Sequence, residues 1–457
     1  MNVVKKYLVK FILSYLRFFA KVALKKEQVI VVGIAGSVGK SSLKNALYAI
    51  LKEQGKTIAL KGNSETGIPL SIFGLTPDDY SPLSWLKIML KVPFKTGNLK
   101  SVKYIVAEMG IDDPNPPKNM DYLLTIIKPD IAINLNVSAT HTMQFEKAFK
   151  PNEKMTLKKL IDAIAFEDTK IVTKSNCTTG IYNADNEFIT KYINVFRKTN
   201  PDIKLLTFGQ DKSNSISLKH YTVGPRRTTF TFLLNENKPY ELNLNLRGRV
   251  LPKAYSDTFA AAVLAARSLK IPLKEIQEGV EKNFSLPKGR SGYFEGIKDS
   301  IIIDSTYNAS KESMLTFLDL LKDLKRKLKR PAVFVFGDMR ELGVASQEEH
   351  EEVANHAKKI ADYICCVGPQ TKEFALPILK EGDRAGKVDW FKNSTQLGLH
   401  LKENIQPEAI ILFKGSQNEI FLEEAVKFIL KNPQDEKKLC RQTAFWKNVK
   451  SSYFNSN

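Results

Sequence analysis

A glycine-rich stretch near the start of the chain has the residue types and spacing that bind phosphate groups. Residues 33–42 read GIAGSVGKSS and follow the apolar run QVIVV at 28–32. Glycines let backbone N–H groups approach phosphate oxygens, and the N-terminus of a following helix adds a favourable dipole. We expect Lys40 to reach the β- and γ-phosphates of a nucleotide and the Ser41 hydroxyl to bind Mg²⁺. The strict phosphate-loop pattern requires glycine at position 34, where this chain has Ile34. The stretch therefore predicts a variant phosphate loop, with contacts from Gly36, Ser37, Gly39, Lys40, Ser41 and Ser42.

Two later residues could hold a divalent cation. Glu108 ends the apolar run YIVAE, and His141 follows the run DIAINLN. A carboxylate and an imidazole at the ends of neighbouring strands can bind such an ion. Taken alone, each is more often a solvated strand-end or loop residue.

The composition narrows the class of protein. A chain of 457 residues with 43% hydrophobic and 26% charged residues predicts two or three globular domains. The net charge of +20 favours nucleic acids, anionic membranes or anionic substrates as partners. The lysines are scattered and no zinc-finger spacing occurs, so we expect no nucleic-acid partner. Four cysteines form no disulfide framework, which predicts a reduced, cytoplasmic protein.

Apolar runs of β type alternate with longer helical stretches from residue 28 onward, which predicts α/β domains with parallel sheets. Residues 203–246 instead predict a small antiparallel insert at the end of the first domain, and a stretch rich in Gly and Pro at 285–296 predicts a domain boundary. The expected order is a helix at 1–26, a central nucleotide-binding domain at 27–290, a Rossmann-like α/β domain at 291–432 and a partly ordered polar tail at 433–457.

The first 26 residues contain no Asp or Glu. They are too often interrupted by lysine to span a membrane or to form a signal peptide. In a helix, Lys6, Lys10, Arg17 and Lys21 fall on one arc, with apolar residues on the far side. This pattern predicts a basic amphipathic helix on the inner surface of an anionic membrane. The alternative is a helix packed on the protein's own body with a solvated lysine face.

The spacing G-x-x-G-x-x-G-K-[ST] resembles the ATP loop of the Mur ligase family. These enzymes form amide bonds in peptidoglycan precursor synthesis, and folylpolyglutamate synthases are their relatives. Further stretches resemble family motifs in the same order over residues 28–430. They are GNSETGIPL (62–70), YNAD (182–185), LPKGRSG (286–292), IIIDSTYNAS (301–310) and VFGDMRELG (335–343).

The resemblance implies a central domain with the phosphate loop and a C-terminal α/β domain. It implies that Glu108 and His141 bind Mg²⁺, that Arg290 contacts the γ-phosphate, and that Asp304, Tyr307 and Asn308 contact ATP. Asp338 and Glu341 would shape the site for the amine, with loop hydrogen bonds as an equal alternative. The implied reaction is ATP-driven amide synthesis through an acyl phosphate. Its substrates would be a small-molecule or lipid-linked acid and an amino acid or dipeptide.

Four departures from the family pattern matter. Only the helix at 1–26 precedes the loop, where the family branch has a UDP-binding domain. Asp168 stands where the family often has a carbamoylated lysine, and could imitate its charge in catalysis. The alternatives there are Lys158, Lys159, Lys170, or a role for Asp168 as a surface carboxylate. RGRVLPKAYSD replaces the usual Gly-x-His-Asn, and Gln417 replaces an Arg.

Two competing functions remain at this point. One is a ligase of the same fold for another acid, such as a folate or a poly-amino-acid. The other is a nucleotide-binding structural or regulatory protein that no longer ligates.

Overall fold

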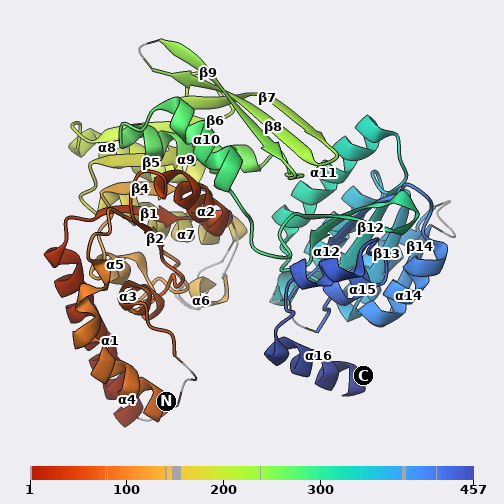
Figure 1. The fold of residues 1–457 in the computed structure, drawn as a ribbon, viewed down its shortest axis with the longest axis horizontal. Coiled ribbons are helices and arrows are strands. Elements are labelled where there is room, and N and C mark those ends of the chain that lie inside the picture. Colours follow the sequence, from red (N-terminus) through yellow and green to blue (C-terminus); the bar gives the residue numbers. More distant parts are fainter. Residues whose placement is uncertain are drawn as a thin grey trace. The chain divides into compact units, whose positions relative to one another are not determined.

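The computed structural model describes residues 3–77, 79, 81–138, 142–146, 156–236, 238–340, 342–382, 387–417 and 419–456. The chain divides into two compact units, and Figure 1 labels their elements. The first unit contains Met1–His220, Thr231–Leu244 and Tyr255–Ser285. The second contains Tyr221–Phe230, Asn245–Ala254 and Leu286–Asn457.

A nine-stranded sheet with the order β2-β3-β1-β4-β5-β6-β7-β8-β9 has β1 to β6 in the first unit, while β7, β8 and β9 contribute residues to both units. Its strands are β1 (Ile30–Ala35), β2 (Thr57–Ala59), β3 (Tyr104–Glu108), β4 (Ile131–Asn134), β5 (Thr179–Asn183), β6 (Lys204–Gly209), β7 (Ile216–Gly224), β8 (Arg227–Asn235) and β9 (Pro239–Arg247). From β2 to β6 all pairs are parallel, as the alternating pattern predicts. The α/β class is thus confirmed. The strands expected to form an antiparallel insert are β7, β8 and β9, and they extend this sheet rather than forming a sheet of their own.

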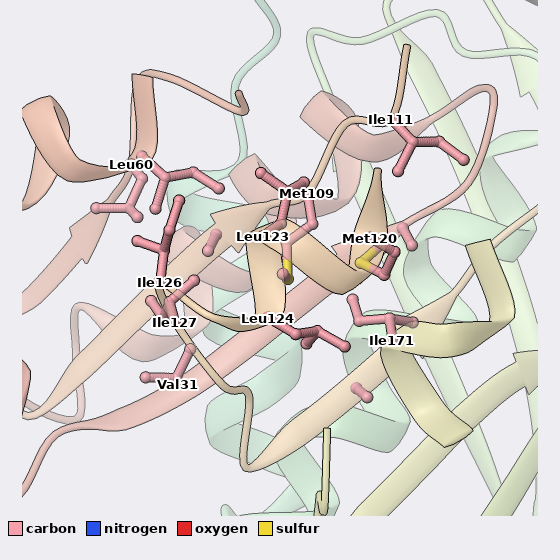
Figure 2. Packing of buried hydrophobic residues seen from close by; sticks show 14 of the residues in the cluster. Val31, Leu60, Met109, Ile111, Met120, Leu123, Leu124, Ile126, Ile127 and Ile171 are labelled. Carbon is pink, nitrogen blue, oxygen red and sulfur yellow. The ribbon is translucent and has the colours of Figure 1, made fainter. Parts of the chain in front are cut away.

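Helices pack against this sheet. They are α1 (Val3–Lys26), α2 (Lys40–Leu51), α3 (Gly67–Phe73), α4 (Pro82–Lys91), η1 (Pro93–Leu99), α5 (Met120–Leu124), α6 (Thr142–Glu146), α7 (Leu157–Thr173), α8 (Glu187–Thr199), α9 (Tyr255–Ser268) and α10 (Leu273–Asn283). Figure 2 shows how Val31 of β1, Met120 and Leu124 of α5, and Ile171 of α7 gather in one buried cluster. Such packing fixes the strand ends that carry the loops.

The N-terminal helix α1 packs on the body of the first unit. Leu16, Ala20 and Ala23 are fully buried, and the Tyr15 hydroxyl donates to the Met89 carbonyl oxygen over 2.9 Å. This packing agrees with the alternative drawn from the sequence, although the outer face of α1 is apolar as well as basic. None of the described helices is long and apolar enough to cross a membrane.

The second unit is built on a six-stranded sheet with the order β10-β11-β15-β12-β13-β14. Only β10 runs antiparallel to its neighbour, so the unit is the expected α/β domain. The strands are β10 (Gly292–Glu295), β11 (Ile301–Ser305), β12 (Ala332–Gly337), β13 (Tyr363–Val367), β14 (Val388–Phe391) and β15 (Ile410–Lys414). The helices are η2 (Ile297–Asp299), α11 (Lys311–Leu328), η3 (Gly343–Ala345), α12 (Ser346–Ala357), η4 (Thr371–Ala375), α13 (Leu376–Lys380), α14 (Ser394–Asn404), α15 (Glu423–Lys427), η5 (Pro433–Lys438) and α16 (Ala444–Ser456).

The segment from residue 433 to residue 456 is ordered, so the expectation of a partly ordered tail is wrong. Leu439, Arg441 and Lys450 are all buried in the second unit. The Arg441 guanidinium donates to both carboxylate oxygens of the fully buried Glu423, over 2.8 and 2.6 Å. The polar composition of residues 433–456 does not predict their burial, because the buried charges of the segment pair with groups inside the unit.

Candidate active site

The glycine-rich loop connects β1 to α2, which begins at Lys40. Gly36 and Gly39 have φ values of 133° and 92°, which glycine adopts without strain. A Cβ at Gly36 would lie 2.9 Å from the Asn136 carbonyl oxygen, so no larger residue fits. Ile34 is still part of β1 and is fully buried. The loop therefore turns after Ile34, which explains why glycine is not needed at that position.

The lysine and first serine of the loop are held by the loop itself and by neighbouring strands. Lys40 Nζ donates to the carbonyl oxygens of Gly36 and Ser37. Ser37 Oγ donates to the Ser138 carbonyl oxygen over 3.1 Å and accepts from the Ser138 N–H over 3.0 Å. These bonds fasten the loop to the segment that follows β4. The Lys40 ammonium thus lies over the loop, where phosphate oxygens would replace the carbonyls as its partners.

Asp168 of α7 lies beside this loop. Its side chain is 2% exposed, and the Gly36 backbone and the charge of Lys40 both act on its ionisation. Burial raises the pKa of Asp168 to about 7, against the opposing effects of Lys40 and the Gly36 N–H. The alternative of a surface carboxylate is therefore wrong. Of the lysine alternatives, Lys158 and Lys159 are exposed in the first turn of α7.

The third alternative, Lys170, is committed to another group of charges. Its Nζ pairs with Asp121 over 2.7 Å and with Glu167, and its side chain is buried. Asp168 is thus the residue of this set that the structure places at the loop.

Glu108 ends β3, next to β1 in the sheet, and is buried. Its Oε2 accepts from Ser41 Oγ over 3.0 Å, and its Oε1 pairs with Lys44 Nζ over 2.6 Å. Two predicted magnesium ligands, Ser41 and Glu108, are thus neighbours, and their oxygen atoms suit a hard cation. His141 lies outside the described residues. Within the described part of the chain, no three His, Cys, Asp or Glu side chains gather in a group suited to a metal ion.

A polar cluster at the ends of β4, β5 and the start of α9 borders the loop. Asn183 Nδ2 donates to Asn136 Oδ1 over 2.6 Å and to Asp257 Oδ2 over 3.4 Å. Burial raises the pKa of Asp257 to about 6, and the nearby Asp185 adds to the effect. Thr258 is the next residue in α9. Its hydroxyl oxygen lies 3.9 Å from the position that a Cβ atom on Gly39 would occupy.

The sequence indicated part of this cluster through the YNAD motif but missed Asp257. Asp257 stands in the stretch that departs from the family pattern, and its spacing along the chain gives no sign that it reaches the loop.

In the second unit, predicted ATP-contacting residues gather at the ends of β11 and β15. The Arg290 guanidinium carbon lies 4.8 Å from the centre of the Tyr307 ring. Asp304 is fully buried; one oxygen accepts from the N–H and the hydroxyl of Thr306. Among the described residues, Asp304 Oδ2 and Arg290 Nε have no hydrogen-bond partner. Burial raises the pKa of Asp304 to about 6.

Lys414, at the end of β15, was not predicted as a site residue. It is 2% exposed, and its Nζ donates to the Asn308 carbonyl oxygen over 2.9 Å and to Ser305 Oγ over 3.3 Å. Burial lowers the pKa of Lys414 to about 7, and the charge of Arg290 adds to the effect. Asn308 takes part here through its backbone. Gln417, three residues further, is half-buried.

A pocket of about 970 Å³ lies at the ends of β12, β13 and β14 in the second unit. Its lining includes Asp338, Arg340, Lys372, Trp390 and Tyr453. The Asp338 carboxylate accepts from the backbone N–H groups of the first turn of η4, over 3.0 and 2.7 Å. The loop hydrogen bonds predicted as one alternative for Asp338 are therefore present, while Glu341 lies outside the described residues.

His350, which follows the motif that contains Asp338, is fully buried. Its Nε2 accepts from the Met339 N–H over 3.0 Å, so its Nδ1 carries the proton and donates to the Ser346 carbonyl oxygen over 2.7 Å. Burial lowers the pKa of His350, which keeps the ring neutral. His350 thus holds the loop that lines the pocket.

Comparisons with known proteins identify the family of the chain. The Mur ligase middle domain matches residues 34–265, and the Mur ligase glutamate ligase domain matches residues 289–417. The UDP-N-acetylmuramoyl-tripeptide--D-alanyl-D-alanine ligase of Buchnera aphidicola is 27% identical over 407 residues, which cover 87% of this chain and 75% of the relative. The enzyme of that description from Escherichia coli is 25% identical over 409 residues, covering 88% and 77%.

Solved structures show the same fold. MurF from Acinetobacter baumannii superposes with a TM-score of 0.70 at 21% identity, over 91% of this chain and 79% of that one. MurF ligase from Thermotoga maritima in complex with ADP gives a TM-score of 0.67 at 22% identity, over 94% and 85%. With a family match over more than half of its residues, the chain belongs to the Mur ligase family of ATP-dependent ligases.

Proposed function

We propose that this chain joins the carboxylate of a peptidoglycan precursor to the amine of an amino acid or dipeptide, using ATP. The observation that carries the proposal is the convergence of Lys40, the Ser41–Glu108 pair and Asp168 on one loop. A phosphate loop alone would serve any nucleotide-binding protein. A loop with two buried carboxylates close to it can also hold Mg²⁺ and balance the charge of a transferred phosphoryl group. The similarity to D-alanyl-D-alanine ligases favours a muramoyl peptide and D-alanyl-D-alanine as the substrates.

The backbone N–H groups after Gly36 cradle the phosphates, and Lys40 Nζ turns from its carbonyl partners to the β- and γ-phosphate oxygens. Ser41 and Glu108, with His141 by family resemblance, would hold Mg²⁺. When bound, the ion offsets charge on the phosphate oxygens. Asp168 beside Lys40 keeps that ammonium aimed at the loop and takes the place of the carbamoylated lysine of relatives. The Asn183–Asp257 cluster borders the loop and would receive the nucleoside.

The proposed reaction has two steps. A carboxylate oxygen of the precursor attacks the γ-phosphorus, the bond to the β–γ bridging oxygen breaks, and ADP leaves. The amine nitrogen then attacks the acyl carbon, the carbon–oxygen bond to phosphate breaks, and the nitrogen gives up a proton. By family resemblance, Arg290 would contact the γ-phosphate in the first step. Most of the acceleration comes from positioning, because the phosphate already activates the acyl group.

The pocket in the second unit is proposed to receive the amine substrate. Three cationic residues line it, Arg340, Lys372 and Lys392, and these would attract the free carboxylate of an amino acid or dipeptide. Asp338 shapes the pocket through its backbone hydrogen bonds.

Phosphate release from ATP tests this function. With a muramoyl tripeptide and D-alanyl-D-alanine as the probes, release should require both. Lys40→Ala should lower the rate about a hundredfold or more, because a charge that stabilises the transition state is lost. Lys52→Ala, at an exposed lysine just after the same helix, is the matched control and should keep the rate.

Two outcomes would support the competing functions. Release that depends on a folate and glutamate, but not on the muramoyl peptide, would identify a ligase for another acid. ATP binding without release for any acid and amine would identify a non-ligating protein. Near-normal ligation by the Lys40→Ala variant would remove the loop from the mechanism.

We also propose that the protein works in the cytoplasm. Its four cysteines are free and buried, as in a reduced compartment. A contact with the inner membrane surface was predicted for α1, and the structure leads to a more specific form of that proposal.

A further inference from the structure

Two neighbouring helical segments of the first unit expose large apolar side chains. One is α1 and the other is α4 with η1, and Figure 1 shows α1 and α4 running side by side. The exposed fractions reach 65% at Leu90 and 88% at Phe94. We call these side chains together the two-helix face. Its members are Tyr7, Leu8, Phe11, Phe18, Leu83, Leu86, Leu90 and Phe94.

We propose that the two-helix face is a membrane-docking surface, which enters the interface of a bilayer rich in anionic lipids. This goes beyond the predicted role of residues 1–26, because α4 and η1 supply half of the apolar side chains. The proposal does not depend on the ligase reaction.

The two segments form one rigid surface. The Tyr15 hydroxyl donates to the Met89 carbonyl oxygen over 2.9 Å, and Lys26 Nζ donates to Thr96 Oγ1 over 3.5 Å. Their inner sides share one buried cluster, to which Leu16 and Ile88 both belong. A surface of this kind loses little conformational entropy on docking, because its backbone is already ordered.

The exposed side chains lie on one side of each helix. At about 100° per residue, Tyr7, Phe11 and Phe18 fall within roughly 40° of one another on α1, with Tyr15 adjacent. Because Tyr15 reaches α4, this apolar arc borders α4. On α4, Leu83, Leu86 and Leu90 fall within roughly 60°. Monomeric proteins in water seldom leave such an arrangement uncovered.

The charge around the two-helix face selects a bilayer as the occupant. Residues 1–26 and 82–107 contain no Asp or Glu. The basic residues of the two segments at described, exposed positions are Lys10, Lys21, Lys25, Lys26, Lys87, Lys91 and Lys95. Apolar insertion combined with flanking lysines is typical of interfacial helices on anionic membranes. A basic residue near such a surface strengthens binding about fivefold, since its contribution is about 1 kcal/mol.

Vesicle sedimentation of the full chain tests the proposal. The vesicles are phosphatidylcholine alone or phosphatidylcholine with phosphatidylglycerol, at about 0.1 M and about 1 M salt, where the Debye length falls from about 10 to about 3 Å. We expect the chain to bind the anionic vesicles, and we expect the high salt concentration to weaken this binding. The double variant Leu86→Glu, Leu90→Glu should lower binding at least tenfold, although α1 is untouched. The matched control Val195→Glu, Leu399→Glu changes exposed apolar residues on α8 and α14 and should bind like the parent.

Point variants are preferable to deletion of α1, because deletion would expose the side chains that cover Leu16 and Ala20. Urea unfolding with the parent's midpoint would show that the Leu86, Leu90 variant is folded; Leu86→Ser, Leu90→Ser serves as a second variant. Equal partitioning of the parent and both variants would overturn the proposal. So would a parent that binds neither vesicle. The parent could instead elute as a dimer in gel filtration, while the same substitutions make it elute as a monomer. That result would assign the face to contact with a second copy of the chain.

Discussion

Replacing Asp168 by Asn should make the protein more stable at high pH and less active. The side chain is almost fully buried, and its neighbours at the loop are the Gly36 N–H and the charge of Lys40. Asn has nearly the same shape but cannot ionise. The substitution therefore removes the cost of burying a carboxylate, and with it the negative charge that faces Lys40.

The size of the stability change follows from the pKa of Asp168, which rises from an ordinary value of 3.8 to about 7 on burial. Between these two values the folded chain keeps a proton that the unfolded chain has lost, so the free energy of unfolding falls as the pH rises. At about 1.4 kcal/mol per pKa unit, the whole loss is about 4 kcal/mol, of which about 2–3 kcal/mol falls between pH 5 and pH 8. The Asn variant does not lose this free energy of unfolding, because Asn does not ionise.

The assay is urea unfolding at pH 5 and pH 8 in a background where Trp390 and Trp446 are changed to Phe. The chain has three tryptophans, so the fluorescence then reports on Trp85 in the first unit. The variant's advantage in free energy of unfolding should grow by about 2–3 kcal/mol between the two pH values. Phosphate release by the same variant should be slower at pH 8. The matched control is Asp162→Asn, at a partly exposed residue of α7, the helix that carries Asp168. It removes the ion pair with Lys191 and should keep the parent's rate of phosphate release.

A variant advantage that is the same at pH 5 and pH 8 would refute the reasoning, because it would mean that Asp168 does not change its charge in this range. If the rate and the magnesium dependence of the Asn variant matched those of the parent, Asp168 would have no part in the phosphate site. It would then be a structural residue that happens to border the loop.

Three further predictions concern other parts of the two units. Glu108→Ala should raise the magnesium concentration needed for half-maximal phosphate release, and an unchanged titration would reject Glu108 as a ligand. Lys414→Met should raise the free energy of unfolding of the second unit at pH 6, where a charged lysine must be buried. Because burial lowers the pKa of Lys414 to about 7, this advantage should shrink as the pH rises toward 10, and a pH-independent difference would contradict it. Arg441→Met should cost about 3–5 kcal/mol by leaving Glu423 buried with a weaker partner, whereas Arg326→Met at an exposed ion pair should cost less than about 1 kcal/mol, both by urea unfolding. Equal losses for the two arginines would show that the buried pair has no special role.

The loop could be predicted from sequence because a phosphate loop has a fixed local spacing. Glu108 could be recognised locally only as the end of an apolar run, and the resemblance to Mur ligases supplied its place beside the loop, where β3 pairs with β1. The resemblance to Mur ligases added Asp168 by counting along the chain, and the structure gives it a buried place at the loop.

Lys414 and Asp257 could not be found in this way. Each comes from a segment far along the chain, and only the order of the strands or the packing of α9 brings it to its cluster. Residues 433–457 were misjudged for a related reason. Their charges predict exposure, but Arg441 is satisfied by Glu423 and by the Thr306 carbonyl oxygen, which lie elsewhere in the sequence. Partners of this kind cannot be predicted from the composition of the segment.

The place of β1 in the middle of its sheet has a consequence for the order of folding. Ile30 pairs with Tyr104 and Val32 pairs with Ile131, so the strand that carries the loop gains its neighbours only when distant parts of the chain meet. The hairpin of β7 and β8 closes over a short turn and can form early. Contacts made late are largely absent from the transition state for folding, and strengthening them mainly slows unfolding. A nucleotide on the loop should therefore extend the lifetime of the native state while leaving the rate of refolding almost unchanged.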